Sequence, residues 1–590
     1  MKRVVPVPAF FFFFLAYVGF GCSSSHSNPI TASSQAEENK SPQEIAFFEE
    51  ITPSANIDFT PRNGEEADQY TILESLGSGV AAIDYDGDGL MDLYFVGGGF
   101  FSGADKKNIT GLGGKLYRNC GNGLFRDVTI ESGLDKLAGG APWFYAHGVA
   151  VSDYDCDGYP DLLVLGWRHV ALFHNEKGQK FVDVTRSSHL DQGILWGVSA
   201  AWADLDGDGW PDLYICQYLD WSWQKHPVDC IFYNVRDICP PNRFHGLTHK
   251  VFRNLRNGQF ADVSDTCGLV QGAFNLSKGL GVVAVDVNGD RKPDLYVAND
   301  DSGNFLYINK STPGTIQLEE VGVTSRTARD ERGKANGSMG VDAADYDGCG
   351  KPSLWVTNFE KQFHSLYHNE CTPTNIFFQY QTLAAGISRI GYNYVGWGTG
   401  FADFDLDGDE DIFITNGHVQ RFPSGAGVTR KQKPVLFANQ GNGTFNPVSH
   451  GFGSYGEQGH NGRGAALVDL DNDGRIDLAI SHVNEPVALL KNIYPEHGHW
   501  LGLRLQGRAH CDLVGGRIVC QTSDKTQTRF LKGGGSFASS SDTRIVFGLG
   551  GNEHYQALTV FWPDGSSSDH PGLAMDRYHT IVQKGPDIRK

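Results

Sequence analysis

Clusters of aspartate residues are the part of this sequence best suited to chemistry. A nine-residue pattern places carboxylates at its first, third, fifth and ninth positions and usually glycine at its sixth. It begins at Asp84, Asp153, Asp204, Asp286, Asp345, Asp403 and Asp469. Four carboxylates, with a backbone carbonyl at the seventh position, form the oxygen-only cage that a hard Ca²⁺ ion prefers. Glycine at the sixth position permits the left-handed turn that aims the chain inward. The pattern therefore predicts calcium-binding loops.

Six of the seven loops supply the predicted ligands. They are Asp84, Asp86, Asp88, Leu90 and Asp92; Asp153, Asp155, Asp157, Tyr159 and Asp161; Asp204, Asp206, Asp208, Trp210 and Asp212; Asp286, Asn288, Asp290, Lys292 and Asp294; Asp403, Asp405, Asp407, Asp409 and Asp411; and Asp469, Asp471, Asp473, Arg475 and Asp477. The fourth loop has Arg291 in place of glycine and is expected to bind less tightly. The fifth has Cys349 and Ser353 where carboxylates belong, so we expect it to be empty or weak. About five to six sites are predicted.

Other interpretations of these loops are weaker. An EF-hand needs a glutamate at position 12 and flanking helices, whereas position 12 is an apolar strand residue in every copy. The loops could instead be aspartate-rich turns held by side chain to backbone bonds. The net charge of −20 argues against nucleic acid as a partner, because phosphate binding needs clustered Lys and Arg. Acid could simply solvate the surface, but here it is concentrated in the repeats.

The segments around each loop predict the architecture. A strand of small and apolar residues precedes each loop, and an alternating strand such as DLYFV or DLYIC follows it. A further strand ends in asparagine at Asn119, Asn175, Asn254, Asn309, Asn369, Asn439 and Asn492. Four strands form a blade, and seven copies predict an all-β protein with a seven-bladed β-propeller over residues 46–496.

Insertions lengthen three of the repeats between their second and third strands. They cover roughly residues 100–115, 217–250 and 418–434. Because successive loops alternate between the two ends of a blade, these insertions are expected on the face opposite the calcium loops. Insertions on a rigid scaffold often carry binding, so this face is the predicted surface for a protein or carbohydrate ligand. The insertions could equally be tolerated additions to the surface without a binding role.

The N-terminus predicts export. Lys2 and Arg3 precede a short apolar run, and Gly21 and Cys22 resemble the cleavage and lipidation site of a bacterial lipoprotein. We expect a signal peptide at 1–21, a lipid anchor on Cys22 as the sole membrane attachment, and a disordered tether at 22–45. The expected location is the outer membrane or cell surface. Ordinary cleavage would instead give a periplasmic or secreted protein.

Ten cysteines remain after Cys22, an even number compatible with disulfides in an oxidising compartment. The nearest pairs outside the propeller strands are Cys230 with Cys239 and Cys511 with Cys520. Cys349 could pair with Cys371. The sequence contains no CxxCH motif, which would indicate covalently attached haem, and no paired CxxC motifs, which would indicate zinc.

These motifs resemble known families. The repeats are similar to the FG-GAP or VCBS repeats of integrin α-subunit propellers, whose loops bind calcium. HWLGLRLQG, FLKGGGSFASSS and LTVFWPDG resemble the ASPIC and UnbV domain. Together they imply kinship with the cartilage acidic protein family. We expect residues 497–585 to form a small β-sandwich or barrel packed against the last blade, with Trp500, Tyr555 and Trp562 more plausible as core residues than as carbohydrate contacts.

Two classes of function fit this pattern. The first is a calcium-binding, extracytoplasmic scaffold for binding or adhesion, because no GxSxG, Walker, HExxH or Rossmann signature stands in a supporting context. The alternative is an exported propeller enzyme that acts on polysaccharide or uses a quinone cofactor. Its chemistry would involve the insertion-face histidines His226, His245 and His249.

Overall fold

The computed structural model describes residues 46–232, 234–272, 276–424, 427–495 and 498–584. Within these residues the chain is all-β and has no α-helix, only short 3₁₀ turns. None of their helices is long and apolar enough to span a bilayer. The predicted signal peptide, the tether and Cys22 lie outside the described residues.

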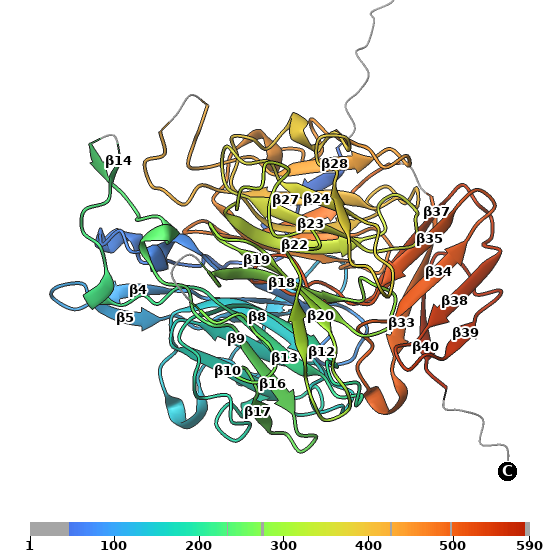
Figure 1. Ribbon diagram of the computed structural model, residues 1–590, viewed down its shortest axis with the longest axis horizontal. Helices are drawn as coiled ribbons and strands as arrows, with labels where there is room; N and C mark the ends of the chain where they lie inside the picture. The colour runs from blue at the N-terminus through green and yellow to red at the C-terminus, as the bar shows by residue number, and fades with distance from the viewer. Residues whose placement is uncertain (1–45, 233, 273–275, 425–426, 496–497, 585–590) are drawn as a thin grey trace, which may run out of the picture. The chain divides into compact units, whose positions relative to one another are not determined.

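Seven antiparallel sheets, each with four strands from the repeats, follow one another along the described part of the chain, and a strand of the C-terminal domain adds to the fourth (Figure 1). The first three are β2 (Val80–Ile83), β3 (Asp92–Phe95), β6 (Lys115–Asn119) and β7 (Phe125–Asp127); β8 (Ala146–Ser152), β9 (Asp161–Gly166), β10 (His169–Asn175) and β11 (Phe181–Asp183); and β12 (Gly197–Ala203), β13 (Asp212–Gln217), β16 (Lys250–Asn254) and β17 (Phe260–Asp262). The next three are β18 (Gly279–Val285), β19 (Asp294–Asn299), β20 (Phe305–Asn309) and β21 (Leu318–Glu320); β22 (Ser338–Ala344), β23 (Ser353–Asn358), β24 (Ser365–Asn369) and β25 (Phe378–Tyr380); and β26 (Gly396–Ala402), β27 (Asp411–Asn416), β28 (Val435–Asn439) and β29 (Phe445–Pro447).

The last sheet joins the two ends of the repeat region. It contains β30 (Gly462–Val468), β31 (Asp477–His482) and β32 (Ala488–Asn492), and its outer strand is β1 (Phe48–Glu50) from the other end. Phe48 pairs with Asn492 in antiparallel register. The first strands β2, β8, β12, β18, β22, β26 and β30 contact one another in this order, and β30 contacts β2. The predicted all-β propeller class is confirmed.

Small residues on the first strands allow the sheets to converge at the centre. A Cβ atom on Gly148 would lie 1.8 Å from the carbonyl oxygen of Val198 on the next first strand, and one on Gly340 would lie 2.0 Å from that of Trp397. Only glycine tolerates such an approach. The small residues that precede each acidic loop in the sequence are therefore there for packing.

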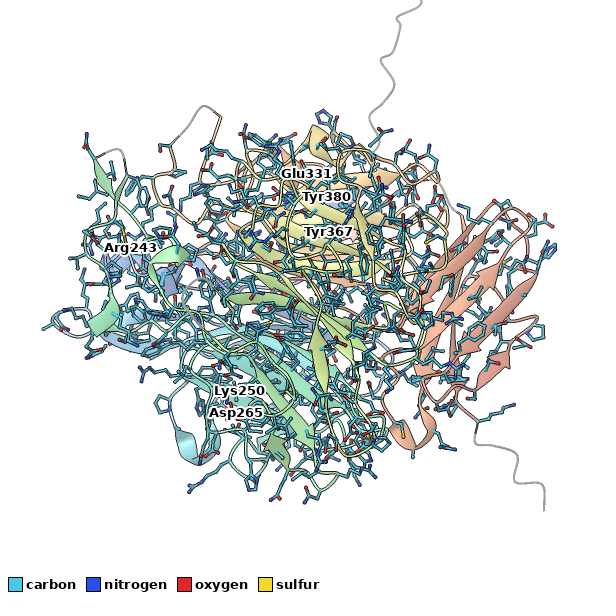
Figure 2. The ribbon with its side chains drawn as sticks, in the orientation of Figure 1. Arg243, Lys250, Asp265, Glu331, Tyr367 and Tyr380 are labelled. Atoms are coloured by element: carbon cyan, nitrogen blue, oxygen red, sulfur yellow. A yellow bond between two sulfur atoms is a disulfide. The ribbon has the colours of Figure 1, made fainter. Side chains whose placement is uncertain are left out.

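Apolar cores fill the spaces between neighbouring sheets. One of them lies between the fourth and fifth sheets and joins Tyr296 to Tyr367 across a ring distance of 6.3 Å. Tyr380 of β25 then packs edge-on against Tyr367 of β24 at 5.6 Å (Figure 2). Every residue of the second strand β19 is buried, because sheets cover both of its faces.

Two further sheets form the C-terminal domain. β33 (His499–Gln506) pairs with β37 (Ile545–Gly550) and β40 (Tyr578–Val582); β34 (Arg517–Gln521) pairs with β35 (Thr526–Phe530) and β38 (Ala557–Phe561), which pairs with β39 (Ser567–Asp569). They share one apolar core that includes Tyr555 and Trp562, and Trp500 is also buried.

A segment of this domain, residues 533–541, enters the centre of the propeller and is here called the plug. Its strand β36 (Gly533–Gly534) pairs with β18. Its Ser540 pairs with Ala81 of the first sheet, and its Ser536 hydroxyl donates to the Ala465 carbonyl oxygen of the seventh at 2.8 Å. Phe537 is fully buried and lies edge-on to Trp397 at 4.7 Å. The C-terminal domain contacts the seventh sheet, as expected, and its glycine-rich plug also contacts the other first strands around the ring.

The insertions lie on the other side of the propeller from the C-terminal domain (Figure 1). They carry the hairpins β4 (Gly99–Ser102) with β5 (Asn108–Gly111) and β14 (Ile231–Phe232) with β15 (Val235–Arg236), and the turns η4 (Trp223–Lys225) and η5 (Pro241–Arg243). Together with η1 (Glu65–Ala67) and η2 (Ile72–Ser75) they form what we call the cap. Its apolar residues share one buried cluster with Phe537 of the plug. The other 3₁₀ turns are η3 (Ala138–Gly140), η6 (Ile387–Arg389), η7 (Tyr455–Glu457) and η8 (Arg508–His510).

Candidate functional sites

Each acidic loop is built on the same backbone bonds. In the third loop, the Gly209 amide donates to Asp204 Oδ2 at 2.7 Å, and Gly209 has a φ of 89°. The corresponding bond closes all seven loops: Gly89 to Asp84, Gly158 to Asp153, Arg291 to Asp286, Gly350 to Asp345, Gly408 to Asp403 and Gly474 to Asp469. The predicted left-handed residue therefore stands at position 6 throughout, and Arg291 adopts it with a φ of 72°.

The ninth-position aspartate is buried and accepts two backbone bonds. Asp212 takes the Leu205 amide at 3.0 Å on Oδ2 and the Asn254 amide at 2.8 Å on Oδ1. Asp92, Asp161, Asp294, Asp411 and Asp477 do the same. This residue ties its loop to the third strand, a role that the sequence pattern alone did not indicate.

The seventh-position residues hold the fifth-position carboxylates. In the third loop the Trp210 amide donates to Asp208 Oδ1 at 3.0 Å. The amides of Leu90, Tyr159, Lys292, Asp409 and Arg475 make the same bond to Asp88, Asp157, Asp290, Asp407 and Asp473. The predicted ligand positions 1, 5, 7 and 9 are thus fixed by backbone geometry.

Several carboxylate oxygens inside the loops are buried without a hydrogen-bond partner. They are Oδ1 of Asp84, Asp86, Asp155, Asp206, Asp345, Asp403 and Asp471. Ligand atoms of Asp84, Asp86 and Asp92 lie within 4.8 Å of one another, as do those of Asp153, Asp155 and Asp157, and of Asp204, Asp206 and Asp212. Unpaired buried acceptors are costly, and a cation coordinated by them removes that cost. The first, second and third loops therefore fit an oxygen-bound divalent ion.

Burial shifts the acidity of these groups. Burial raises the pKa of Asp153 and of Asp204 to about 7, and that of Asp92 to about 8. Neighbouring carboxylates add to the shift, Asp155 in the case of Asp153. Without a metal ion, these three carboxyl groups therefore keep their protons to a higher pH than an exposed aspartate does.

Basic side chains from the third strand lie against several loops. Arg118 Nε is 2.6 Å from Asp86 Oδ2, and His174 Nδ1 is 3.2 Å from Asp155 Oδ2. Lys491 bonds to Asp471 in the seventh loop. Each of these basic residues stands just before the repeated asparagine of its sheet. Their charges partly neutralise the third-position carboxylates that they contact.

The C-terminal domain covers the loop side of the propeller. Arg504 donates to Asp84 Oδ2 at 3.1 Å, and Lys525 to Asp409 Oδ2 at 2.8 Å. The Tyr578 hydroxyl donates to Asp469 Oδ2 at 2.8 Å. Loops from different sheets thus share one covering domain, which couples their charge to its docking.

The repeated asparagine joins neighbouring sheets, and its recurrence in all seven copies was the available sequence signal for this role. Its Nδ2 donates at 2.8 or 2.9 Å to a second-position carbonyl of the preceding loop. The pairs are Asn119 with Leu470, Asn175 with Tyr85, Asn254 with Tyr154, Asn309 with Leu205, Asn369 with Val287, Asn439 with Tyr346, and Asn492 with Phe404. Asn119 reaches the seventh loop, so these bonds run in cyclic order.

Replacing one such asparagine is expected to weaken the propeller. In Asn254→Ala, the carbonyls of Tyr154 and Pro211 lose donors at 2.8 and 3.1 Å. Buried acceptors left unpaired should lower the free energy of unfolding by about 2–3 kcal/mol. Asn257→Ala, an exposed control in the same hairpin, should change it by less than about 0.5 kcal/mol. Equal losses of stability for the two variants in urea denaturation would contradict the role of the asparagine in joining neighbouring sheets.

Of the three cysteine pairs that the sequence offered as candidates, one is bonded and two are not. Cys230 and Cys239 are bonded. Cys511 and Cys520 are free, because Cys520 is buried in the core of its own domain while Cys511 Sγ lies beside Gly209. Cys349 and Cys371 are also free, since Cys371 is buried with its sulfur against the Phe377 amide.

The cap is held by polar bonds between segments distant in sequence. Asp237, inside the loop that Cys230–Cys239 closes, accepts the amides of Arg421 and Phe422 at 3.0 and 2.8 Å. Arg421 also pairs with Glu74 at 2.5 Å. These contacts order the second and third insertions, for which the sequence left open whether they have any role.

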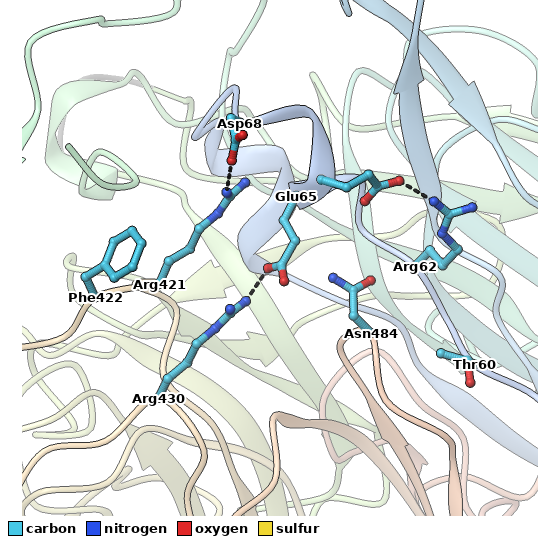
Figure 3. Close-up of a pocket in the computed structure, with 9 residues that line it drawn as sticks. Thr60, Arg62, Glu65, Asp68, Arg421, Phe422, Arg430 and Asn484 are labelled. Carbon is cyan, nitrogen blue, oxygen red and sulfur yellow. Dashed lines mark hydrogen bonds and ion pairs between the residues drawn. The ribbon is translucent and has the colours of Figure 1, made fainter. Parts of the chain in front are cut away.

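A surface pocket of about 580 Å³ lies at the edge of the cap, with charged residues of both signs (Figure 3). Its lining residues are Thr60, Arg62, Glu65, Glu66, Asp68, Arg421, Phe422, Arg430 and Asn484. Arg421 bonds to Asp68, and Arg430 to Glu65. These charged side chains therefore neutralise one another within the pocket.

The histidines proposed for an enzyme differ in their surroundings. His249 is buried, its Nδ1 lies 2.5 Å from the Tyr214 hydroxyl, and burial lowers its pKa to about 3. His226 Nε2 lies 3.3 Å from the Gln69 carbonyl oxygen in the cap, and the backbone carbonyl of His245 accepts the Asp220 amide. His249 is a core residue in this structure.

Comparison with known proteins finds matches for both the propeller repeats and the C-terminal domain. The ASPIC and UnbV family matches residues 507–587, and the FG-GAP-like repeat family matches residues 153–215, 286–356 and 403–480. Cartilage acidic protein 1 of Homo sapiens is 25% identical over 487 residues, covering 71% of this chain and 69% of that protein. The Xenopus tropicalis protein of the same name is 26% identical and covers 71% and 70%.

Solved structures show only low likeness. A lectin of Agrocybe aegerita that recognises non-reducing terminal N-acetylglucosamine has a TM-score of 0.38 and 14% identity, covering 70% of this chain and 87% of that chain. The exotype rhamnogalacturonan lyase YesX has a TM-score of 0.32 and 13% identity, covering 89% and 92%. Neither likeness bears on ligand or chemistry.

The repeats, the C-terminal domain and the relatives agree with one another. The chain belongs to the cartilage acidic protein-like family, in which FG-GAP-like repeats are joined to an ASPIC and UnbV domain.

Proposed function

We propose that this protein is a calcium-stabilised, extracytoplasmic binding scaffold that holds a protein or glycan ligand on its cap. The observation that carries the calcium assignment is the set of buried, unpaired carboxylate oxygens in the loops, for example on Asp84 and Asp206. Oxygen donors at this density suit Ca²⁺. The loops from Asp84, Asp153, Asp204, Asp403 and Asp469 would hold it best.

The position of the C-terminal domain supports the assignment of the ligand to the cap. That domain covers the loop side, where Arg504 and Lys525 contact acidic loops. The cap lies on the other side of the propeller. Surface there is available to a partner.

An apolar patch on the cap favours a protein ligand. Val228, Ile231 and Val235 are 73%, 63% and 42% exposed, and Phe422 is 54% exposed. The Cys230–Cys239 disulfide and the bond from the Phe422 amide to Asp237 hold these residues together. Exposed apolar residues gathered on an ordered surface mark interaction sites.

Export to an oxidising compartment is part of the same proposal. The disulfide between Cys230 and Cys239 is of a kind that persists outside the cytoplasm. A lipid anchor on Cys22 would place the scaffold at the cell surface.

A binding screen tests the function. The full-length protein with calcium would be applied to arrays of extracellular matrix proteins and glycans. For the ligand found, Ile231→Asp should weaken binding at least about tenfold, the effect of losing a central apolar contact. Val323→Asp alters a residue of similar exposure, 69%, that lies outside the cap, and it should leave affinity unchanged. Equal loss in both variants, or loss in neither, would contradict a ligand surface on the cap.

A further inference from the structure

The fifth acidic loop keeps the backbone of the other six but has different side chains. The Gly350 amide still donates to Asp345 Oδ2 at 2.9 Å, and Asn369 still bonds to Val287. Ser353 replaces the ninth-position aspartate, and its hydroxyl oxygen accepts the Asn369 amide at 3.1 Å. The loop therefore has the geometry of a metal loop without its full set of carboxylates.

Three different ligand atoms meet in this loop. An oxygen of Asp347, the sulfur of Cys349 and a ring nitrogen of His368 all lie within 4.8 Å of one another. His368 Nδ1 is 2.9 Å from Asp347 Oδ2. A tetrahedral Zn²⁺ ion, with bonds of about 2.0–2.3 Å, separates its ligand atoms by about 3.5 Å. The three atoms, which lie within 4.8 Å of one another, are close to that spacing.

A second observation indicates a missing ligand in the same loop. Asp345 is 6% exposed, and its Oδ1 is buried without a hydrogen-bond partner. It stands at the first position, from which its Oδ2 already closes the loop. Asp345 can thus supply a fourth ligand atom or hold a metal-bound water.

We propose that the fifth loop binds Zn²⁺ or a similar thiolate-preferring divalent ion through Asp347, Cys349 and His368. Calcium is disfavoured because it needs six to eight oxygen ligands, whereas sulfur and imidazole together favour zinc. Binding releases the Cys349 thiol proton to solvent and leaves the thiolate on the metal.

The site is open to metal from solution. Cys349 is exposed, and the side chains of Asp347 and His368 are each 20% exposed. The bound ion would join the loop before β23 to strand β24. This assignment does not depend on calcium in the other loops.

Cobalt titration tests the site. Full-length protein, reduced and stripped of metal, should bind Co²⁺ with a sulfur-to-cobalt charge-transfer band that Zn²⁺ abolishes and excess Ca²⁺ does not. Cys349→Ser should remove the band, while Cys120→Ser, which alters another exposed cysteine, should retain it. Loss of an outer-shell partner alone costs about 10- to 100-fold in metal affinity, so His368→Gln should weaken Zn²⁺ binding at least about tenfold.

Each remaining outcome would overturn the proposal. A wild-type protein without the band has no thiolate site. A band that survives in Cys349→Ser belongs to another cysteine. Displacement of Co²⁺ by Ca²⁺ would show that the fifth loop is an ordinary oxygen site.

Discussion

Removal of calcium with excess EGTA is expected to lower the melting temperature by about 5–10 °C. A ligand that binds only the folded state stabilises it by RT ln(1 + [L]/Kd), about 2.7 kcal/mol per site at 100 times Kd. Several sites act on one large cooperative unit, whose unfolding entropy keeps the shift within this range. Differential scanning calorimetry in calcium and in EGTA measures it.

The fall in melting temperature on calcium removal should be larger at pH 8 than at pH 6. Burial raises the pKa of Asp153 and Asp204 to about 7 in the metal-free fold, above the usual value of an unfolded aspartate. From the usual pKa of an unfolded aspartate up to the raised pKa of about 7 in the fold, the folded chain binds more protons than the unfolded chain. The stability of the metal-free protein therefore falls as pH rises through this window. If calcium binds as proposed, it takes the place of those protons, and a loss of stability that does not depend on pH would contradict this account.

Two matched variants assign the effect to particular loops. Asp206 is 2% exposed with an unpaired oxygen, so Asp206→Ala should remove one bound calcium and part of the thermal shift. Asp347→Ala, in the loop where sulfur replaces oxygen, should leave the calcium content unchanged. The reverse ranking, or unchanged melting in EGTA, would mean that the loops are only turns.

Removal of one plug side chain, that of Phe537, is the second change for which we expect a large loss of stability. Phe537→Ala should lower the free energy of unfolding by about 3–5 kcal/mol, the usual cost of deleting a buried phenylalanine. Phe537 is fully buried where the plug meets Trp397. Urea denaturation with calcium present measures the change.

The same substitution at an exposed site is the control. Phe422 is 54% exposed on the cap, so Phe422→Ala should cost less than about 0.5 kcal/mol. Limited proteolysis of Phe537→Ala should also cut more readily around residues 533–541, because the plug would leave the centre of the propeller more often. Similar stability losses in both variants would contradict the packing described here.

The regular parts of this molecule were predictable because they repeat. Seven copies of one pattern revealed the acidic loops, the strands beside them and the recurrent asparagine. The pattern could not show what Asn254 contacts, because its partner Tyr154 is 100 residues away. The repeats predicted a ring of blades, but they did not show which groups of neighbouring blades form hydrogen bonds with one another.

The parts that occur once were harder to predict. The plug residues resemble a glycine-rich turn, and nothing in their composition indicates that Phe537 packs between other sheets at the centre of the propeller. Cys511 and Cys520 are near in sequence, yet one faces the third loop and the other its own domain core. The charge of Arg504 likewise gave no sign of its partner Asp84, because tertiary docking alone joins them.

A crystal structure of the protein grown in calcium, with anomalous scattering data collected at long wavelength, tests the central claim most directly. We predict an anomalous peak among the carboxylates of the loops that begin at Asp84, Asp153, Asp204, Asp403 and Asp469. Folded loops with no such peak, and with Arg118 and Lys491 still on their aspartates, would contradict calcium as the ion that stabilises this scaffold.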